Sequence, residues 1–170
     1  MSALLSILAA GALLSSPELG KAEGQCRPNE SGPAFLISIA GLKDHAGKLK
    51  VELYPANDAD FLQDDNILLN AGKTFRRVEV NVPAAPVPEV CIRAPAAGNY
   101  ALIVLHDRDA NRKLTLSKDG IGFPGNPKLG WSKPKAAAAT AHVGSGPTRI
   151  SLTLQYRTGL FSFGPVKQKK

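Results

Sequence analysis

Oxygen-bearing side chains alternate through one short stretch of the sequence, DRDAN (107–111), which directly follows an apolar run. Asp107, Asp109 and Asn111 thereby occupy the first, third and fifth positions of a loop, where calcium-binding loops carry their first ligands. Asp119 offers a further oxygen donor near the end of the same segment. This pattern predicts a calcium site formed by these four side chains.

Two departures oppose tight calcium binding in this segment. Arg112 stands at the position that calcium loops give to Gly, and Lys118 at the position that they give to Glu. Residues 107–119 also carry four bases against three acids, which repels a cation. The alternative is a polar turn in which Asp and Asn side chains hydrogen-bond nearby backbone. The sequence leaves both interpretations open.

A second acidic segment, NDADFLQDDN (57–66), holds four Asp residues and no base. Its spacing matches no metal loop, although its charge would suit a cation. If consecutive strands alternate in direction, this segment emerges at the opposite end of the sheet from Asp107. We expect a solvated loop that presents Asp58, Asp60, Asp64 and Asp65.

His106 beside Asp107 raises the possibility of a small hydrolase. Adjacent residues on a strand point to opposite faces, so these two cannot by themselves align a nucleophile, a base and an orienting acid. The sequence contains no nucleophile-elbow, zincin or phosphate-loop motif. A non-enzymatic protein is the preferred interpretation, with hydrolysis at His106 as a weaker alternative and calcium as the one cofactor to consider.

The segment GIGFPGNPKLGWSKPK (120–135) is the best candidate for a binding surface. Its glycines match the G-x-G-x-x-G spacing of dinucleotide sites, but Pro124 and Pro127 prevent the helix that such sites require. Instead, apolar side chains stand next to bases, and such a surface suits an anionic sugar, a cell-envelope polymer or an acidic protein. The residues are Phe123, Lys128, Leu129, Trp131, Lys133 and Lys135. The alternative is that Trp131 closes one end of the core.

Apolar residues alternate with polar ones in most of the segments that must position these side chains. Such runs cover 34–40, 48–54, 75–82, 89–94, 99–106 and 148–156, and Gly- and Pro-rich turns separate them. The run NYALIVLH is apolar on both faces, which is typical of a central strand. The segment KAAAATAHV is compatible with a helix or an edge strand. We predict an all-β antiparallel sandwich of seven to eight strands, immunoglobulin- or transthyretin-like.

The first residues predict an exported protein. Residues 1–22 read as a signal peptide whose apolar core, Ala3–Leu14, is too short to span a bilayer, with cleavage after Ala22. We expect no transmembrane segment, one domain over 23–163 and a basic disordered tail over 164–170. Because secreted proteins fold in an oxidising compartment, we expect Cys26 and Cys91 to form a disulfide.

The charge is unevenly distributed along the chain. The formal net charge is +7, and from Gly120 to Lys170 there are eight bases and no acid. Nucleic acid is a poor candidate partner, since the chain is predicted to be exported, its aromatic residues are sparse and its bases are scattered. An anionic ligand or protein of the cell envelope fits better.

Three segments of the chain resemble the bacterial domain-of-unknown-function family 2141 (DUF2141). They are the strand GNYALIVLHDRDANRKL, the following GIGFPGNPKLGWS and the upstream AFLISIAGLKDHAGKLKVELY. The matching strand positions are Gly98, Tyr100, Ala101, His106 and Asp107. The resemblance implies an exported bacterial β-sandwich and no established activity. The chain departs from the family pattern where Asn111-Arg112 replaces Asn-Gly, and where a Glu is missing from the Gly/Pro-rich segment.

Overall fold

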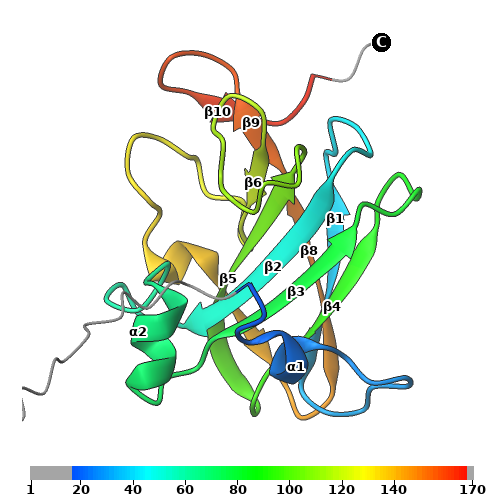
Figure 1. Ribbon diagram of the computed structural model, residues 1–170, viewed down its shortest axis with the longest axis vertical. Coiled ribbons are helices and arrows are strands. Elements are labelled where there is room, and N and C mark those ends of the chain that lie inside the picture. The colour runs from blue at the N-terminus through cyan, green and yellow to red at the C-terminus, as the bar shows by residue number, and fades with distance from the viewer. Residues whose placement is uncertain (1–16, 168–170) are drawn as a thin grey trace, which may run out of the picture.

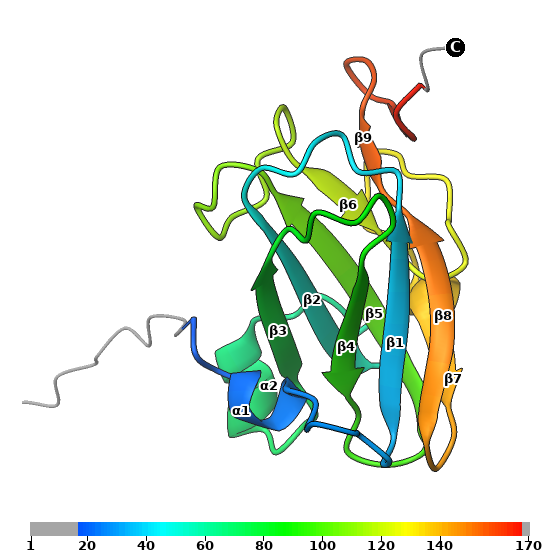
Figure 2. The ribbon, with the colours of Figure 1, turned by 90° about the vertical axis from the view of Figure 1, so that its right-hand side faces the viewer.

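The computed structural model describes residues 17–167. The apolar core of the expected signal peptide and the last three residues of the expected tail lie outside this range. Two β-sheets pack face to face (Figure 2). The smaller sheet has the order β4 (Glu89–Arg93), β1 (Ala34–Ala40), β8 (Pro147–Thr153). The predicted all-β sandwich is confirmed.

The larger sheet is built around β5 (Gly98–Asp107), the predicted central strand. On one side of β5 lie β2 (Lys48–Pro55) and β3 (Arg76–Asn81), and on the other β6 (Gly120–Gly122), β9 (Gln155–Arg157) and β10 (Phe163–Gly164). The start of β5 also pairs with β7 (Thr140–Val143). Figure 1 shows this sheet face on.

One strand pair departs from the expected antiparallel arrangement. β1 and β8 run parallel, with Ala34 opposite Pro147 and Ala40 opposite Thr153. Beyond Leu154 the chain passes from the small sheet into the large one and continues as β9, so a single run of residues serves both sheets. Alternation of apolar residues reports which face a side chain occupies and not the direction of its neighbour, so the sequence did not reveal this pairing.

The main core lies between the two sheets. The inward side chains are those that the period-two pattern indicated, because successive residues of a strand point to opposite faces. Phe35, Ile37, Ile39, Leu49, Val51, Leu53, Leu102, Val104, Leu152 and Leu154 are all buried. Burial of this apolar surface is the main force that holds the sheets together.

A second apolar cluster covers the outer face of the large sheet. Helix α2 (Asp65–Asn70), the 3-10 helix η1 (Ala136–Ala139) and the adjoining loops pack on β5 and β6. Phe61 and Phe123 meet edge to face within this cluster, with ring centroids 6.1 Å apart. This covering layer explains why β5 is apolar on both faces. The ambiguous segment 135–143 divides between η1 and β7.

The chain ahead of β1 packs along the edge of the large sheet. This part of the chain forms α1 (Lys21–Gly24). Just before α1, the Gly20 carbonyl accepts the Arg77 N–H of β3 at 3.0 Å. A Cβ on Gly24 would lie 2.6 Å from the Arg77 carbonyl, so this close approach requires glycine. Cleavage after Ala22, as expected from the sequence, would remove the Gly20 carbonyl from β3.

The expected disulfide between Cys26 and Cys91 is confirmed. It joins the segment before β1 to β4, with the two Cα atoms 6.0 Å apart, and spans 65 residues of sequence. A loop of that length stabilises the folded state by about 4 kcal/mol on the chain-entropy model. Among residues 17–167, no helix is both long enough and apolar enough to cross a membrane.

Candidate functional site

His106 lies on the inward face of β5 and is completely buried. Its Nε2–H donates to the Ala46 carbonyl at 2.9 Å, and its Nδ1 accepts the Tyr156 hydroxyl at 2.7 Å. Tyr156 in turn accepts the Lys43 N–H at 3.1 Å. Because a carbonyl only accepts, these contacts define one neutral tautomer of the imidazole. His106 therefore joins β5, β9 and the loop between β1 and β2.

The surroundings of His106 do not favour hydrolysis. Burial lowers the pKa of His106, which keeps the ring neutral, and burial raises the pKa of Tyr156 to about 12. Tyr156 is thus held as a protonated phenol and not as a nucleophile. Gly120 makes room for it, since a Cβ there would lie 2.5 Å from the Tyr156 ring. The sequence motif at the end of β5 forms a structural junction.

Asp107 points to the opposite side of β5 from His106, as the strand period predicts. There it meets two other predicted calcium ligands: oxygen atoms of Asp107, Asp109 and Asp119 all lie within 4.8 Å of one another. Asp107 and Asp119 are buried, and Asp109 is partly accessible through its side chain. We refer to these three residues as the carboxylate cluster.

The loop's own backbone supplies most of the hydrogen bonds to this cluster. The Asp107 carboxylate accepts the N–H groups of Asn111 and Arg112, at 3.1 and 2.7 Å. The Asp119 carboxylate accepts those of Arg108 and Thr115, at 3.0 and 2.7 Å. Each of these oxygens retains a lone pair beyond the N–H that it accepts. The residues present are therefore compatible with a cation.

Arg112, the residue at the expected Gly position, adopts the glycine-like conformation nonetheless. Its φ is 67°, and Ala110 has a φ of 54°. Non-Gly residues occupy this left-handed region at a cost, and here the two N–H bonds to Asp107 hold the backbone in place. The fourth predicted ligand, Asn111, uses its Oδ1 to accept the Lys113 N–H at 2.7 Å.

The electrostatics of the cluster differ from residue to residue. Burial is the main cause of the raised pKa of Asp107, and the charge of Asp119 adds to it. The hydrogen bond from Lys118, at 3.0 Å, is the main cause of the lowered pKa of Asp109. A cation among these carboxylates would offset the repulsion from Asp119, which adds to the effect of burial on the pKa of Asp107.

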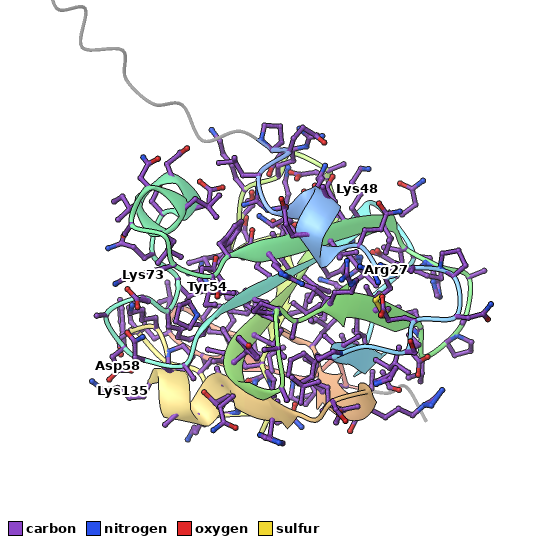
Figure 3. All side chains as sticks on the ribbon, turned by 90° about the horizontal axis from the view of Figure 1, so that it is seen from below. Arg27, Lys48, Tyr54, Asp58, Lys73 and Lys135 are labelled. Atoms are coloured by element: carbon purple, nitrogen blue, oxygen red, sulfur yellow. A yellow bond between two sulfur atoms is a disulfide. The ribbon has the colours of Figure 1, made fainter. Side chains whose placement is uncertain are left out.

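The other acidic segment lies at the opposite end of the large sheet, as predicted. Asp107 pairs with Lys48 at the start of β2, whereas the acidic segment follows Pro55 at the end of β2. Its acids are not simply solvated. Asp58 accepts the Ala136 N–H at 2.7 Å and pairs with Lys135, as Figure 3 shows, and Asp60 pairs with Lys73.

Asp65 belongs to a buried polar group on the outer face of the sheet. The Arg77 guanidinium lies between Glu52, at 2.8 Å, and Asp65, at 3.1 Å. The Tyr54 hydroxyl donates to Glu52 at 2.7 Å. Asp64 caps α2 by accepting the Asn66 N–H at 2.9 Å. Asp65 therefore fastens α2 to β3, whereas Asp58 and Asp60 join loops of the covering layer to one another.

The residues of segment 120–135 are divided between the interior and the surface. Phe123 and Leu129 are buried in the outer apolar cluster. Trp131 is 78% exposed, so the interpretation that it closes the core is wrong. It stacks on Phe161, with the ring centroids 3.7 Å apart. Because Phe161 lies in the turn between β9 and β10, two distant segments share one surface.

An apolar groove of about 230 Å³ runs beside Trp131. Ile103 and Ile121 of the large sheet line it together with Phe123 and Leu129, and Leu114, Leu116 and Phe163 complete its walls. Ser132 and Lys133 are its polar lining residues. The groove lies next to the carboxylate cluster in sequence, since Leu114 and Leu116 come from the same loop.

The three predicted lysines play different parts. Lys133 donates to the Phe61 carbonyl at 2.6 Å and Lys135 pairs with Asp58, so both fasten segment 120–135 to the acidic segment. Lys128 is exposed and makes no ion pair within residues 17–167. Of the three, Lys128 is the one whose charge is available to a ligand.

Sequence reasoning missed the half-exposed Leu114 and Leu116, and also Leu160, Phe161 and Phe163. A signal was present in the alternation of leucines with polar residues in NRKLTLSK and in the apolar run GLFSF near the C-terminus. Large apolar residues in turns that otherwise carry polar side chains indicate surface exposure. Their position beside Trp131 depends on the tertiary fold.

Comparison with known proteins gives one match. Residues 37–151 match the family described as an uncharacterised protein conserved in bacteria (DUF2141). Neither the curated proteins nor the solved structures contain a match. The matched range begins within β1 and ends within β8, so it includes β5, the carboxylate cluster and Trp131.

Proposed function

The chain belongs to the bacterial family DUF2141, and on this premise we propose that it is a non-enzymatic binding domain of the cell envelope. The proposed ligand is anionic and partly apolar, and it binds at the groove beside Trp131. The neutral, doubly hydrogen-bonded state of His106 supports a non-enzymatic role.

Two features support export. Residues 1–22 have the composition of a signal peptide, and the Cys26–Cys91 disulfide is a bond that persists in oxidising compartments. Cell fractionation, together with the mass of the processed chain, tests this part of the proposal. Recovery of the unprocessed chain in the cytoplasm with both thiols reduced would contradict it.

The observation that carries the binding proposal is the exposed Trp131 ring, stacked on Phe161 above an apolar groove. A large exposed apolar surface is disfavoured on a soluble domain unless something binds there. The bases at the groove select the class of ligand, because Lys133 lines it and Lys128 lies in the adjoining depression with Phe163. An anion with an apolar body satisfies both conditions.

Decanoate tests the binding proposal, with decanol as its uncharged counterpart. The chain has a single Trp, so the emission of Trp131 reports directly on the groove. We expect decanoate to shift the emission to shorter wavelength at lower concentration than decanol does. The double variant Leu114→Ser/Leu116→Ser should weaken the effect, and Val87→Ser, an exposed apolar residue of the β3–β4 loop, should leave it unchanged. Emission that decanoate does not alter would refute the proposal.

A second candidate function is calcium binding at the carboxylate cluster. The convergence of three carboxylates within 4.8 Å favours it. Asp107, Asp109 and Asp119 would hold the ion, with Asn111 as a further oxygen donor, and the ion would stabilise the loop that forms one wall of the groove. Ligands that bind only the folded state raise the melting temperature.

Thermal unfolding of the oxidised protein in millimolar calcium and in chelator tests this candidate. Calcium should raise the melting temperature by several degrees, and Asp109→Ala should abolish the shift. Asp60→Ala, which removes an acid from the other segment, is the matched control and should keep it. Superimposable melting curves with calcium and with chelator would show that the segment is a polar turn.

A further inference from the structure

We propose that Trp131, Leu160 and Phe161, here called the aromatic tip, insert into the interface of a lipid bilayer that contains anionic lipid. The inference rests on the proposed function, since it names the partner of the same surface. The groove beside the tip would accommodate apolar groups of the lipid.

The aromatic tip exposes a large apolar area to water. Trp131 is 78% exposed, Leu160 75% and Phe161 54%. The turn between β9 and β10 and the loop after β6 extend to the same side of the large sheet, on the left in Figure 1. Transfer of these side chains out of water is favourable in proportion to the area buried. Trp is also enriched where a membrane meets water, because its ring is apolar and its N–H is polar.

The charges around the tip match an anionic surface. Lys128 makes no ion pair within residues 17–167, and it lines a depression together with Phe163, which also lines the groove. The loop that carries Leu114 and Leu116 also holds three acids. Asp109 pairs with Lys118 at 3.0 Å, and Asp107 and Asp119 are buried. Each base near an anionic bilayer adds to the attraction.

The groove lining favours lipid over carbohydrate. A sugar ring needs several hydrogen-bond partners beside the aromatic face on which it stacks. The polar side chains of the groove are Ser132 and Lys133, and the Lys133 ammonium already donates to the Phe61 carbonyl at 2.6 Å. An acyl chain needs no such partners.

The backbone of the tip is prepared for an apolar environment. Arg157 donates to the carbonyls of Gly159 and Leu160, at 2.9 and 3.2 Å. The Thr158 N–H donates to the Ser162 carbonyl at 2.9 Å. Because these groups are paired within the turn, partial insertion leaves fewer polar groups without a partner.

Vesicles of defined composition test the inference. The oxidised protein is mixed with vesicles of phosphatidylcholine, alone or with phosphatidylglycerol, and binding is measured by co-flotation. We expect binding to vesicles with phosphatidylglycerol, with a shift of Trp131 emission to shorter wavelength. Phospholipids brominated on the acyl chain should quench that emission, since bromine quenches only a Trp that reaches the acyl region.

Two variants separate insertion from charge attraction. Leu160→Ser/Phe161→Ser should lower the partition coefficient about tenfold. Lys128→Gln should lower it about fivefold, and only on anionic vesicles. Val87→Ser should bind like the unaltered protein, because the β3–β4 loop lies on the other side of the molecule in Figure 1. An unchanged melting temperature shows that each variant is folded.

The outcomes distinguish this inference from the proposed function. Absence of binding to phosphatidylglycerol vesicles, or binding without quenching by brominated lipid, overturns the inference. If decanoate still shifts Trp131 emission in that case, the proposed function stands without a lipid partner. If decanoate has no effect either, both are wrong. Another outcome is a protein that fails to bind vesicles but associates with itself. If Leu160→Ser/Phe161→Ser abolishes that self-association, the inference is overturned and the tip is a protein interface.

Discussion

Two Asp-rich segments at opposite ends of the large sheet arrange their acids in different ways. In the segment that follows β2, each of three acids is paired with a base of another element: Asp58 with Lys135, Asp60 with Lys73, Asp65 with Arg77. In the segment that follows β5, Asp107, Asp109 and Asp119 gather together, and backbone N–H groups of their own loop donate to Asp107 and Asp119.

The difference lies in where the opposing charges reside. The first segment contains no base, so its acids pair with bases supplied by the covering layer and β3, and in doing so they join parts of the fold. The second segment contains four bases of its own. Most of these bases face outward, and Asp107 and Asp119 turn inward toward the backbone, while Asp109 is exposed and pairs with Lys118. The acids of the first segment join separate elements, whereas those of the second hold the backbone of their own loop and lie within 4.8 Å of one another.

The largest expected effect is the loss of Arg77. Arg77→Met should lower the free energy of unfolding by about 3–5 kcal/mol, because the buried carboxylates of Glu52 and Asp65 would lose the guanidinium that lies between them. Chemical denaturation measures the change. Arg76→Met is the matched control, since it removes a single hydrogen bond to the Arg93 carbonyl. An equal or smaller loss in Arg77→Met would show that the buried pair does not fasten α2.

Asp119→Asn should have the next largest effect, about 1–3 kcal/mol in chelator. Asn offers one carbonyl oxygen, so either the Arg108 or the Thr115 N–H would be left without an acceptor. Denaturation in chelator isolates this structural part from any metal effect. Asp109→Asn, in the same cluster but with an exposed carboxylate that pairs with the exposed Lys118, should cost less. The reverse order would show that the cluster's hydrogen bonds do not hold the loop.

The two segments should respond to acid with opposite signs. Burial raises the pKa of Asp107, so its contribution to stability is present below the ordinary value of 3.8 and is lost as pH rises through the folded-state pKa. Lys73 lowers the pKa of Asp60, so its contribution is present above 3.8 and is lost as pH falls through the folded-state pKa. NMR titration of both carboxyl groups checks this. If the titration midpoints of Asp107 and Asp60 were displaced from the ordinary value in the same direction, the two segments would not differ in their response to acid.

The smallest expected effect is at Lys135. Its pair with Asp58 is exposed, so Lys135→Gln should leave the melting temperature unchanged at physiological salt. Lys118→Gln, in the second segment, is the counterpart and should also have no measurable effect in chelator. A large loss in only one of them would show that exposed charge contributes unequally at the two ends.

Much of the fold follows from local pattern. The alternation in β1, β2 and β5 identified the inward residues, and it also placed His106 and Asp107 on opposite faces. The covering layer was harder to predict, because α2 has only six residues and is too short to show a helical stripe. The burial of Arg77 was also unexpected, since its neighbours in space come from β2 and α2.

The candidate site was predicted in part. Asp107, Asp109 and Asp119 were identified from spacing, because the loop that joins them is short. In the segment 120–135, composition could not distinguish the buried Phe123 and Leu129 from the exposed Trp131. That division depends on the outer cluster, to which Phe61, α2 and η1 contribute. The stacking of Trp131 on Phe161 likewise requires the position of β10.

The parallel pairing of β1 with β8 sets an order of assembly. β1 meets β4 early, and the disulfide can hold that pair, but the other edge of β1 stays open until residues 147–153 are available. Such distant pairings make folding slow, and an unpaired strand edge is prone to aggregate. During synthesis, which starts at the N-terminus, β1 therefore lacks its second neighbouring strand until nearly the whole chain has been made. Deletion of the last strands would leave that edge permanently open to other chains.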